Sequence, residues 1–306
     1  MRILFIGDIV GKPGRELLRK GLRRLVDHYG VEFVIANVEN AAAGFGITKD
    51  IGDTIVEWGV DVMTSGNHIW DKKEVLEYIP GEPRLLRPAN YPAGVPGRGS
   101  YVAQSGDGRA VGVINVMGRV FMLNIDDPFQ IVLREIEAMR NRTKIIVVDF
   151  HAEATSEKIA MGWHLDGKAT LVVGTHTHVQ TADERILPNG TAYLTDAGMT
   201  GPHDSIIGME REPSLARFLN GMPSRFEPAT GNPRLNGVIV DADDKTGRAV
   251  AVRRISYSEQ ELLDLQAGAA ANLLTHTRVP ALTLREPQGH PEHRRGASEP
   301  GGRVEG

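Results

Sequence analysis

The chain contains no cysteine among its 306 residues. Disulfide frameworks, thiolate zinc sites and cysteine nucleophiles are therefore excluded, and the absence is typical of a reducing compartment. Long apolar runs are also missing, since the run Ile145–Val148 is far below the about 18 residues that a membrane-spanning helix needs. The apolar stretch of the N-terminal MRILFIGD is too short for a secretory signal. We expect a soluble, cytoplasmic protein.

An excess of charge of one sign is missing too. The chain has 35 Lys and Arg against 39 Asp and Glu, hence a net charge of −4. Domains that bind nucleic acid over a broad surface usually carry an excess of Lys and Arg. We therefore expect no stable nucleic-acid binding and no membrane partner. A small phosphate-bearing ligand in a local site remains compatible with this balance. The apolar share of 41% is ordinary for a globular protein.

The first 200 residues repeat one unit, a short β-branched apolar run followed at once by polar residues and glycine. Between several runs lie stretches with helical apolar spacing, such as Arg15–His28 and Asp50–Trp58. This alternation predicts a sheet with helices on its faces, and continuous apolar runs indicate strands buried on both sides. The five runs are Ile3–Ile6, Phe33–Val38, Val60–Thr64, Ile145–Val148 and Leu171–Val173.

Two hairpins predict a second sheet and therefore a layered α/β sandwich. The first lies within residues 80–124, a segment rich in proline and glycine. We expect one domain over residues 1–284. The segment 285–306 has almost no large apolar side chain, and we expect it to be disordered. The hairpin strands are Tyr101–Gln104 with Ala110–Val116, and Gly237–Asp241 with Ala249–Ile255.

Polar side chains end each of the five strands. In open α/β sheets, ligands bind beyond the carboxyl ends of the strands. Any one of these residues has an ordinary explanation, such as a turn, a helix cap or a hydrogen-bonded core histidine, but five together are hard to assign to structure alone. The strand ends are Gly7-Asp8, Glu39-Asn40, Gly66-Asn67-His68, Asp149-Phe150-His151 and Gly174-Thr175-His176-Thr177-His178.

The donor types indicate the metal class. Carboxylate, amide and imidazole groups without sulfur suit Mn, Fe or Zn. Six or seven candidates exceed what one tetrahedral zinc ion needs, so two ions that share a carboxylate are the natural count. Paired ions roughly 3.5–4 Å apart stabilise the attacking and leaving oxygens of phosphoryl transfer. The residues therefore predict a dinuclear hydrolase of phosphate esters.

The same motifs resemble the calcineurin-like metallophosphoesterase superfamily. The chain departs from its usual pattern twice: Asp8 is not followed by the histidine of Asp-x-His, and Asn37-Val38-Glu39-Asn40 stands where an aspartate usually bridges the metals. With these departures, the chain is similar to the YmdB family of bacterial phosphodiesterases over about residues 1–260. The motifs that carry this are Gly7-Asp8, Gly66-Asn67-His68-Ile69-Trp70-Asp71, His151, Gly174–His178 and Thr195–Pro202.

The resemblance implies an α-β-β-α metallophosphoesterase sandwich with two packed mixed sheets. It also implies two metal ions per chain, most often iron, with manganese or zinc as alternatives, acting on 2′,3′- or 3′,5′-cyclic nucleotides. Glu39 would bridge the ions. The remaining ligands would be Asp8, Asn40 and His178 for one ion, and Asn67, His151 and His176 for the other.

The resemblance further implies that a metal-bridging hydroxide attacks phosphorus, with His68 as the catalytic proton donor to the leaving ribose oxygen. Side chains that could stack on a nucleotide base are harder to identify from the sequence than the metal ligands, because aromatic side chains near polar loops more often pack the loops onto the core. The loop Gly198–Gly208 could approach a phosphate, form a turn or contact another subunit. The four stacking candidates are Phe45, Trp70, Trp163 and His203.

Other functions stay open at this stage. A phosphomonoesterase or nucleotidase would use the same metals, and a ligand-sensing or RNA-associated regulator would keep the site with weak catalysis. A dinucleotide-binding protein is disfavoured, because Gly7–Gly14 lacks the G-x-G-x-x-G spacing. Homo-oligomerisation is compatible with the sequence, although no residue pattern demonstrates it.

Overall fold

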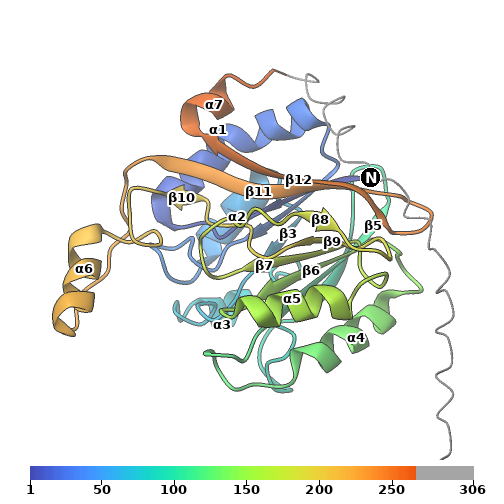
Figure 1. Ribbon diagram of the computed structural model, residues 1–306, viewed down its shortest axis with the longest axis horizontal. Coiled ribbons are helices and arrows are strands. Elements are labelled where there is room, and N and C mark those ends of the chain that lie inside the picture. The colour runs from blue at the N-terminus through green and yellow to red at the C-terminus, as the bar shows by residue number, and fades with distance from the viewer. Residues whose placement is uncertain (267–306) are drawn as a thin grey trace, which may run out of the picture.

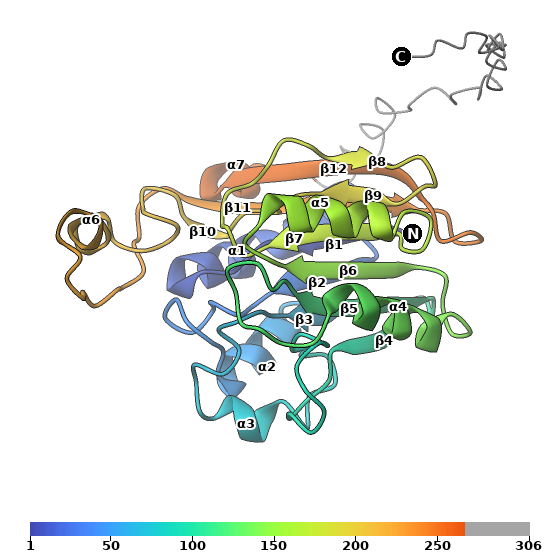
Figure 2. The ribbon, with the colours of Figure 1, turned by 60° about the horizontal axis from the view of Figure 1, so that its bottom comes forward.

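Two β-sheets lie face to face, with helices on their outer sides (Figures 1 and 2). This computed structural model describes residues 1–266. The architecture is the predicted α-β-β-α sandwich with two mixed sheets, because each sheet contains both parallel and antiparallel pairs. The segment 285–306, expected to be disordered, and the last part of the expected 1–284 domain lie outside the described residues. In the part described, no helix is long and apolar enough to cross a membrane.

The first sheet has the strand order β10-β11-β1-β2-β3, with β12 paired to β11. Leucines of the longest helix pack on its outer face together with shorter helices, in one apolar cluster. The strands are β1 (Arg2–Ile6), β2 (Phe33–Asn37), β3 (Val62–Thr64), β10 (Gly201–Pro202), β11 (Pro233–Ala242) and β12 (Ala249–Ser258). The helices are α1 (Gly11–Tyr29), α2 (Lys49–Glu57), α3 (Val75–Tyr78) and α7 (Glu259–Leu263).

The second sheet has the strand order β4-β5-β6-β7-β9-β8. Its outer face packs against two helices in a second apolar cluster. The strands are β4 (Ser100–Gln104), β5 (Ala110–Met117), β6 (Ile146–His151), β7 (Leu171–Thr175), β8 (Arg185–Ile186) and β9 (Ala192–Leu194). The two helices are α4 (Pro128–Met139) and α5 (Thr155–His164).

The space between the sheets is filled by β-branched and aromatic side chains that are fully buried. Phe5 and Ile35 of the first sheet share one cluster with Val113, Val147 and Val173 of the second. Each of these strands is buried on both faces, which is why its sequence reads as a continuous apolar run. The packing holds the carboxyl ends of the central parallel strands of both sheets beside one another.

The five predicted strands exist, but they do not share one sheet. β1, β2 and β3 belong to the first sheet, whereas β6 and β7 belong to the second. The second sheet is therefore not built from the hairpins alone: β4 and β5 join it, and β11 and β12 join the first. Asp149-Phe150-His151 lies within β6 rather than beyond it. Continuous apolar runs cannot distinguish these arrangements, because both bury both faces of every strand.

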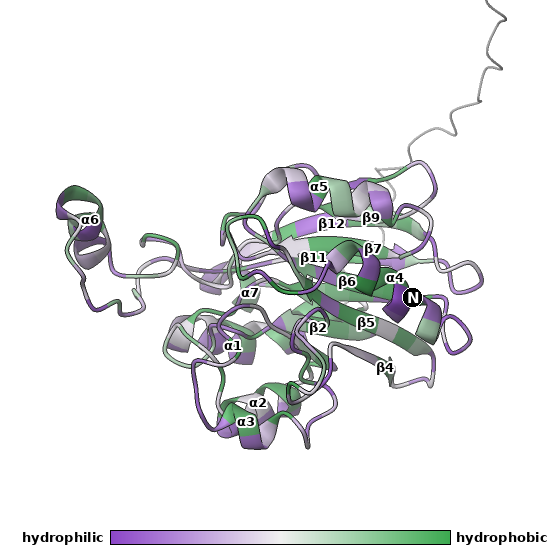
Figure 3. Cartoon of the chain, turned by 90° about the horizontal axis from the view of Figure 1, so that it is seen from below, coloured by the Kyte–Doolittle hydropathy of each residue, from purple (hydrophilic) through white to green (hydrophobic). Residues whose placement is uncertain are grey.

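One element stands away from this sandwich. Helix α6 (Arg211–Asn220) lies in an arm that projects beyond both sheets (Figures 1–3). We call residues 210–227 the α6 arm, because the backbone N–H of Glu210 donates to the carbonyl of Glu227 at its base. Leu215, Phe218 and Leu219 on this helix are exposed.

Candidate metal centre

The seven predicted ligands meet where the two sheets face each other. Asp8 follows β1, Glu39 and Asn40 follow β2, and Asn67 follows β3. His151 ends β6, while His176 and His178 follow β7. One half of the site therefore belongs to each sheet, and the packed interior between the sheets sets their separation.

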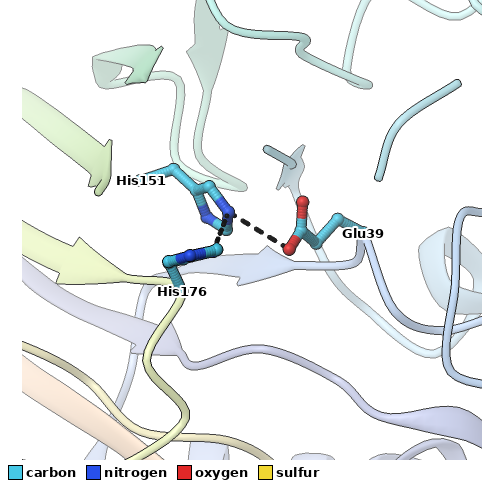
Figure 4. A group of neighbouring side chains, drawn as sticks. All are labelled: Glu39, His151 and His176. Carbon is cyan, nitrogen blue, oxygen red and sulfur yellow. Dashed lines mark hydrogen bonds and ion pairs between the residues drawn. The ribbon is translucent and has the colours of Figure 1, made fainter. Parts of the chain in front are cut away.

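Three of these side chains converge on an imidazole nitrogen of a fourth, His151. His151 Nε2 lies 2.9 Å from Asn67 Oδ1, 3.0 Å from His176 Nδ1 and 3.2 Å from Glu39 Oε1. Figure 4 shows Glu39, His151 and His176 pointing at one another. These four residues are the set that the family resemblance implies for one ion.

The other predicted set lies beside it and shares Glu39. Asn40 Nδ2 lies 3.2 Å from Glu39 Oε1 and 3.1 Å from His178 Nε2. Asp8 Oδ1 lies 3.9 Å from His178 Nε2, while Asp8 Oδ2 accepts the backbone N–H of His176 at 3.3 Å. The structure thus brings all seven residues into one continuous group.

A buried oxygen without a hydrogen-bond partner indicates, independently of the sequence motifs, that these residues fit a metal site. Asp8 Oδ1 is buried and has no hydrogen-bond partner within residues 1–266, and an unpaired buried carboxylate is costly unless a cation compensates it. Two imidazole nitrogens, a carboxylate and an amide oxygen around one point are donors that suit Mn, Fe or Zn. The ligand role of each residue remains a prediction.

Burial and mutual charge shift the protonation of this group. Burial raises the pKa of Asp8 well above its usual value. Burial opposes the ionisation of Glu39 as well, but the charge and hydrogen bond of His151 outweigh it and lower its pKa to about 2. The pKa of His151 rises to about 9, because the carboxylates of Glu39, Asp8 and Asp149 outweigh its burial. Burial, with the charge of His151 added, lowers the pKa of His176 to about 3.

Each imidazole is oriented through its second nitrogen. His151 Nδ1 lies 2.9 Å from Thr175 Oγ1, which donates to Asp149 Oδ1 at 2.7 Å. His178 Nδ1 donates to the carbonyl of Ile207 at 2.7 Å. His176 Nε2 lies 3.0 Å from Glu153 Oε2. Partners of this kind fix the tautomer and ring direction of metal-binding histidines.

The backbone around the ligands is tightly constrained. A Cβ at Gly66 would lie 2.1 Å from His151 Cδ2, and a Cβ at Gly7 would lie 1.9 Å from the carbonyl oxygen of Gly198. Only glycine fits at these two motif positions. His176 and His178 both have positive φ, 98° and 66°, a conformation that L-residues with side chains adopt at a cost.

A buried ion pair holds the loop that carries His176 and His178. Lys158 Nζ donates to Asp196 Oδ2 at 2.6 Å, and both side chains are almost completely buried. The same carboxylate oxygen accepts the backbone N–H and the hydroxyl of Thr177, at 3.2 and 2.7 Å. Thr177 lies between the two histidines, so the pair fixes the turn on which both depend.

His68 lies at the rim of this group. Its backbone N–H donates to Glu39 Oε2 at 3.1 Å, and its Nδ1 lies 2.8 Å from Asp71 Oδ2. The ring packs edge-on against Phe45. Both aromatic side chains line one cavity with four of the predicted ligands: Glu39, Asn40, His176 and His178.

That cavity has a volume of about 670 Å³ and extends from the predicted ligands to helix α6. Of the four stacking candidates, Phe45 lines it. Trp70 packs against Tyr91, Trp163 of α5 stacks with Arg185 of β8, and His203 contacts Gly201 and Asn236. The loop Gly198–Gly208 contributes Ile206 and Ile207 to the wall and the carbonyl that orients His178.

Several residues of the site were not predicted from the sequence. Lys158 acts on the turn after β7 through Asp196, and Glu153 contacts the ring of His176 directly. Each partner lies more than twenty positions further along the chain. Arg217, Phe218 and Phe226 line the cavity from the α6 arm. No local pattern marks them, because the arm carries no strand or polar strand end.

Known proteins similar to this chain match most of its length. The profile of the YmdB-like protein family matches residues 4–255. The chain is 51% identical to a Bacillus subtilis protein named 2′,3′-cyclic-nucleotide 2′-phosphodiesterase, over 86% of this chain and 99% of that protein. It is 35% identical to a Mycoplasma pneumoniae protein named as a putative phosphatase/phosphodiesterase, over 85% and 94% of the two chains.

Solved structures agree as well. A Thermus thermophilus protein superposes with a TM-score of 0.77 at 42% identity, over 84% of this chain and 99% of that one. A Mycoplasma pneumoniae protein described as a novel phosphatase superposes with a TM-score of 0.78 at 35% identity, over 84% and 93% of the two chains. By its profile match and its relatives, the chain belongs to the YmdB-like family.

Proposed function

We propose that the chain is a dinuclear-metal-dependent phosphodiesterase that hydrolyses 2′,3′-cyclic nucleotides. The observation that carries the proposal is the convergence of seven donor side chains from both sheets around the shared carboxylate of Glu39. The name of the Bacillus subtilis relative supports the substrate class. A cavity of about 670 Å³ is within the range of small-ligand sites.

Asp8, Asn40 and His178 would hold one cation, Asn67, His151 and His176 the other, with Glu39 between them; iron, manganese and zinc all suit these donors. Two bound cations would supply charge stabilisation at the phosphoryl oxygens and would make the attacking water more acidic. The protein's part is to keep the donors rigid, which the orienting contacts of Thr175, Ile207 and Glu153 do.

His68 would move the proton. When the bond from phosphorus to the ribose 2′ oxygen breaks, the leaving oxygen takes a proton from the imidazole while water supplies the new oxygen on phosphorus. Asp71 beside Nδ1 keeps one ring nitrogen hydrogen-bonded and leaves the other for this transfer. The position of His68 in the cavity wall supports this role.

The test is turnover measured together with metal content. The purified protein, reconstituted with iron or manganese, should hold about two ions per chain and cleave 2′,3′-cAMP. Glu39→Gln keeps the shape of the buried side chain but removes its charge, and should reduce both metal content and turnover. Glu137→Gln, a change at an exposed carboxylate on α4, is the matched control and should change neither. A protein that binds no metal under these conditions would contradict the proposal.

Phosphomonoester hydrolysis is the second candidate. The names of the Mycoplasma relatives, which include phosphatase, favour it for the same site. Comparing a cyclic diester with a terminal phosphate monoester on the loaded protein separates the two. Preference for the monoester would replace the phosphodiesterase proposal, and two bound metals without turnover on either would favour a ligand-sensing role.

A further inference from the structure

The cavity has a second end that the predicted ligands do not reach. Its near end is polar and contains Glu39, His176 and His178, whereas its far wall comes from the α6 arm. The arm contributes Phe218 and Phe226 as apolar side chains, and Ile206, Ile207 and Met209, which precede the arm in the chain, add further apolar surface to the cavity wall. The arm projects from the sandwich in every view (Figures 1–3), so its contribution to the cavity is separate from the packing of the two sheets.

Arg217 is the one lysine or arginine among the described residues that line this cavity. Its guanidinium lies over the ring of Phe226, 5.3 Å from the ring centre. No ion pair of Arg217 occurs within residues 1–266. A guanidinium that stacks by its face keeps its N–H edge free, and this edge matches the paired oxygens of a phosphate.

The charges of the cavity indicate what this edge is for. A 2′,3′-cyclic phosphate carries one negative charge, which the metal end would compensate, and the ribose and the base are neutral. The two carboxylates that line the cavity are also occupied, since Glu39 contacts His151 and Glu153 contacts His176. An arginine at the far wall therefore has no charge partner in a simple cyclic mononucleotide. A nucleotide with a second phosphate supplies one.

We propose that Arg217, stacked on Phe226, forms a subsite for the 5′-phosphate of a nucleotide whose cyclic phosphate lies at the metal centre. The substrate class is then a 2′,3′-cyclic nucleotide that is phosphorylated at its 5′ oxygen, as a free nucleotide or as the end of an oligonucleotide. This proposal rests on the phosphodiesterase function proposed above. It agrees with the net charge of −4 of the chain, because a contact with one phosphate needs no basic surface.

The experiment compares adenosine 2′,3′-cyclic phosphate with the same nucleotide carrying a 5′-phosphate and with a dinucleotide ending in a 2′,3′-cyclic phosphate. Arg217→Met removes the charge but keeps much of the apolar stem. Arg211→Met, on the same helix and outside the cavity wall, is the matched control. We expect Arg217→Met to lower kcat/KM for 5′-phosphorylated substrates about tenfold, as for a lost charge-assisted hydrogen bond. The substrate without a 5′-phosphate should change less than about twofold.

An effect on the free 5′-phosphorylated nucleotide alone would assign the subsite to free nucleotides, and an effect on the dinucleotide as well would extend it to oligonucleotide ends. Equal loss on all three substrates, or no loss on any, would overturn the subsite. Binding of adenosine 3′,5′-bisphosphate and adenosine 3′-phosphate, measured by calorimetry, does not need turnover. If the unmodified protein shows no diesterase activity but Arg217→Met loses affinity for the bisphosphate and not for adenosine 3′-phosphate, the proposed function is rejected and the subsite is kept.

Discussion

At the scale of single residues, the contact between His68 and Asp71 separates the proposed proton donor from the predicted metal ligands. His68 touches Glu39 only through its backbone N–H, while its ring is held by Asp71 at 2.8 Å. Neither ring nitrogen of His68 contacts the cluster around His151 in the part of the chain that the structure describes. The two functions of the site can therefore be changed independently.

We expect His68→Ala to lower kcat by about 10²- to 10⁴-fold, the usual range for the loss of a general acid. Metal content should stay near that of the wild type, because the backbone contact to Glu39 does not need the side chain. Asp71→Asn should lower kcat by a smaller factor. Pre-steady-state turnover with metal analysis measures both, and unchanged turnover in His68→Ala would remove this residue from the mechanism.

The residues of the site are predictable from sequence where they lie at a strand end. Asp8, Glu39, Asn67 and His151 each end an apolar run, so local pattern alone points to them. Arg217 is different. It approaches the cavity only through the course of the α6 arm, and an arginine on an amphipathic helix is typical of a solvated face.

At the scale of elements, the turn after β7 depends on the buried pair of Lys158 and Asp196. α5 supplies the lysine, and the carboxylate holds Thr177 between the two histidines. The helix thus acts on the site without contributing a ligand. Sequence reasoning does not find such a residue, because a lysine in a helix predicts exposure and its partner lies 38 positions further on.

Lys158→Met should leave the carboxylate of Asp196 buried without its cation. The loss of one partner of a buried pair costs about 3–5 kcal/mol of folding free energy, and the turn that carries His176 and His178 should lose metal affinity. Lys168→Met, an exposed lysine just beyond the same helix, is the control and should change stability by less than about 0.5 kcal/mol. Chemical denaturation and metal titration provide the two readouts. Equal stability of the two variants would contradict the anchoring role.

The arrangement of the strands into two sheets is the part of the fold that local pattern cannot give. β3 and β6 read alike as buried strands, yet they lie in different sheets. What separates them is the pairing of β5 with β6 and of β1 with β11. The second of these pairings joins segments more than two hundred residues apart in the chain. In the absence of the family resemblance, one sheet with an added hairpin layer fits the same apolar runs.

At the scale of the whole molecule, metal binding should stabilise the fold in a pH-dependent way. In the metal-free protein the raised pKa of His151, about 9, adds stability that is complete below about pH 6.5 and disappears as the pH rises through 9. A metal ion needs the neutral imidazole and must displace this proton. The stabilisation by metal should therefore be smaller at low pH and should grow as the pH rises.

Thermal unfolding of the loaded and the chelated protein at about pH 6 and pH 8 measures this. At metal concentrations of about 100 times Kd the gain is about 2.7 kcal/mol, which corresponds to a rise in Tm of several degrees for a chain of this size. The rise should be larger at pH 8. Glu39→Gln should show little rise at either pH, and a rise independent of pH in the wild type would contradict the proton displacement.

The division of the ligands between the two sheets makes the distance between the sheets a catalytic dimension. Asp8, Glu39, Asn40 and Asn67 move with one layer, and the three histidines move with the other. Two cations work on a phosphate only when they lie roughly 3.5–4 Å apart. The valines and isoleucines packed between the two sheets then determine how far apart the two groups of ligands lie. A change in their volume should therefore alter the reaction rate as well as the stability, although none of them lines the cavity.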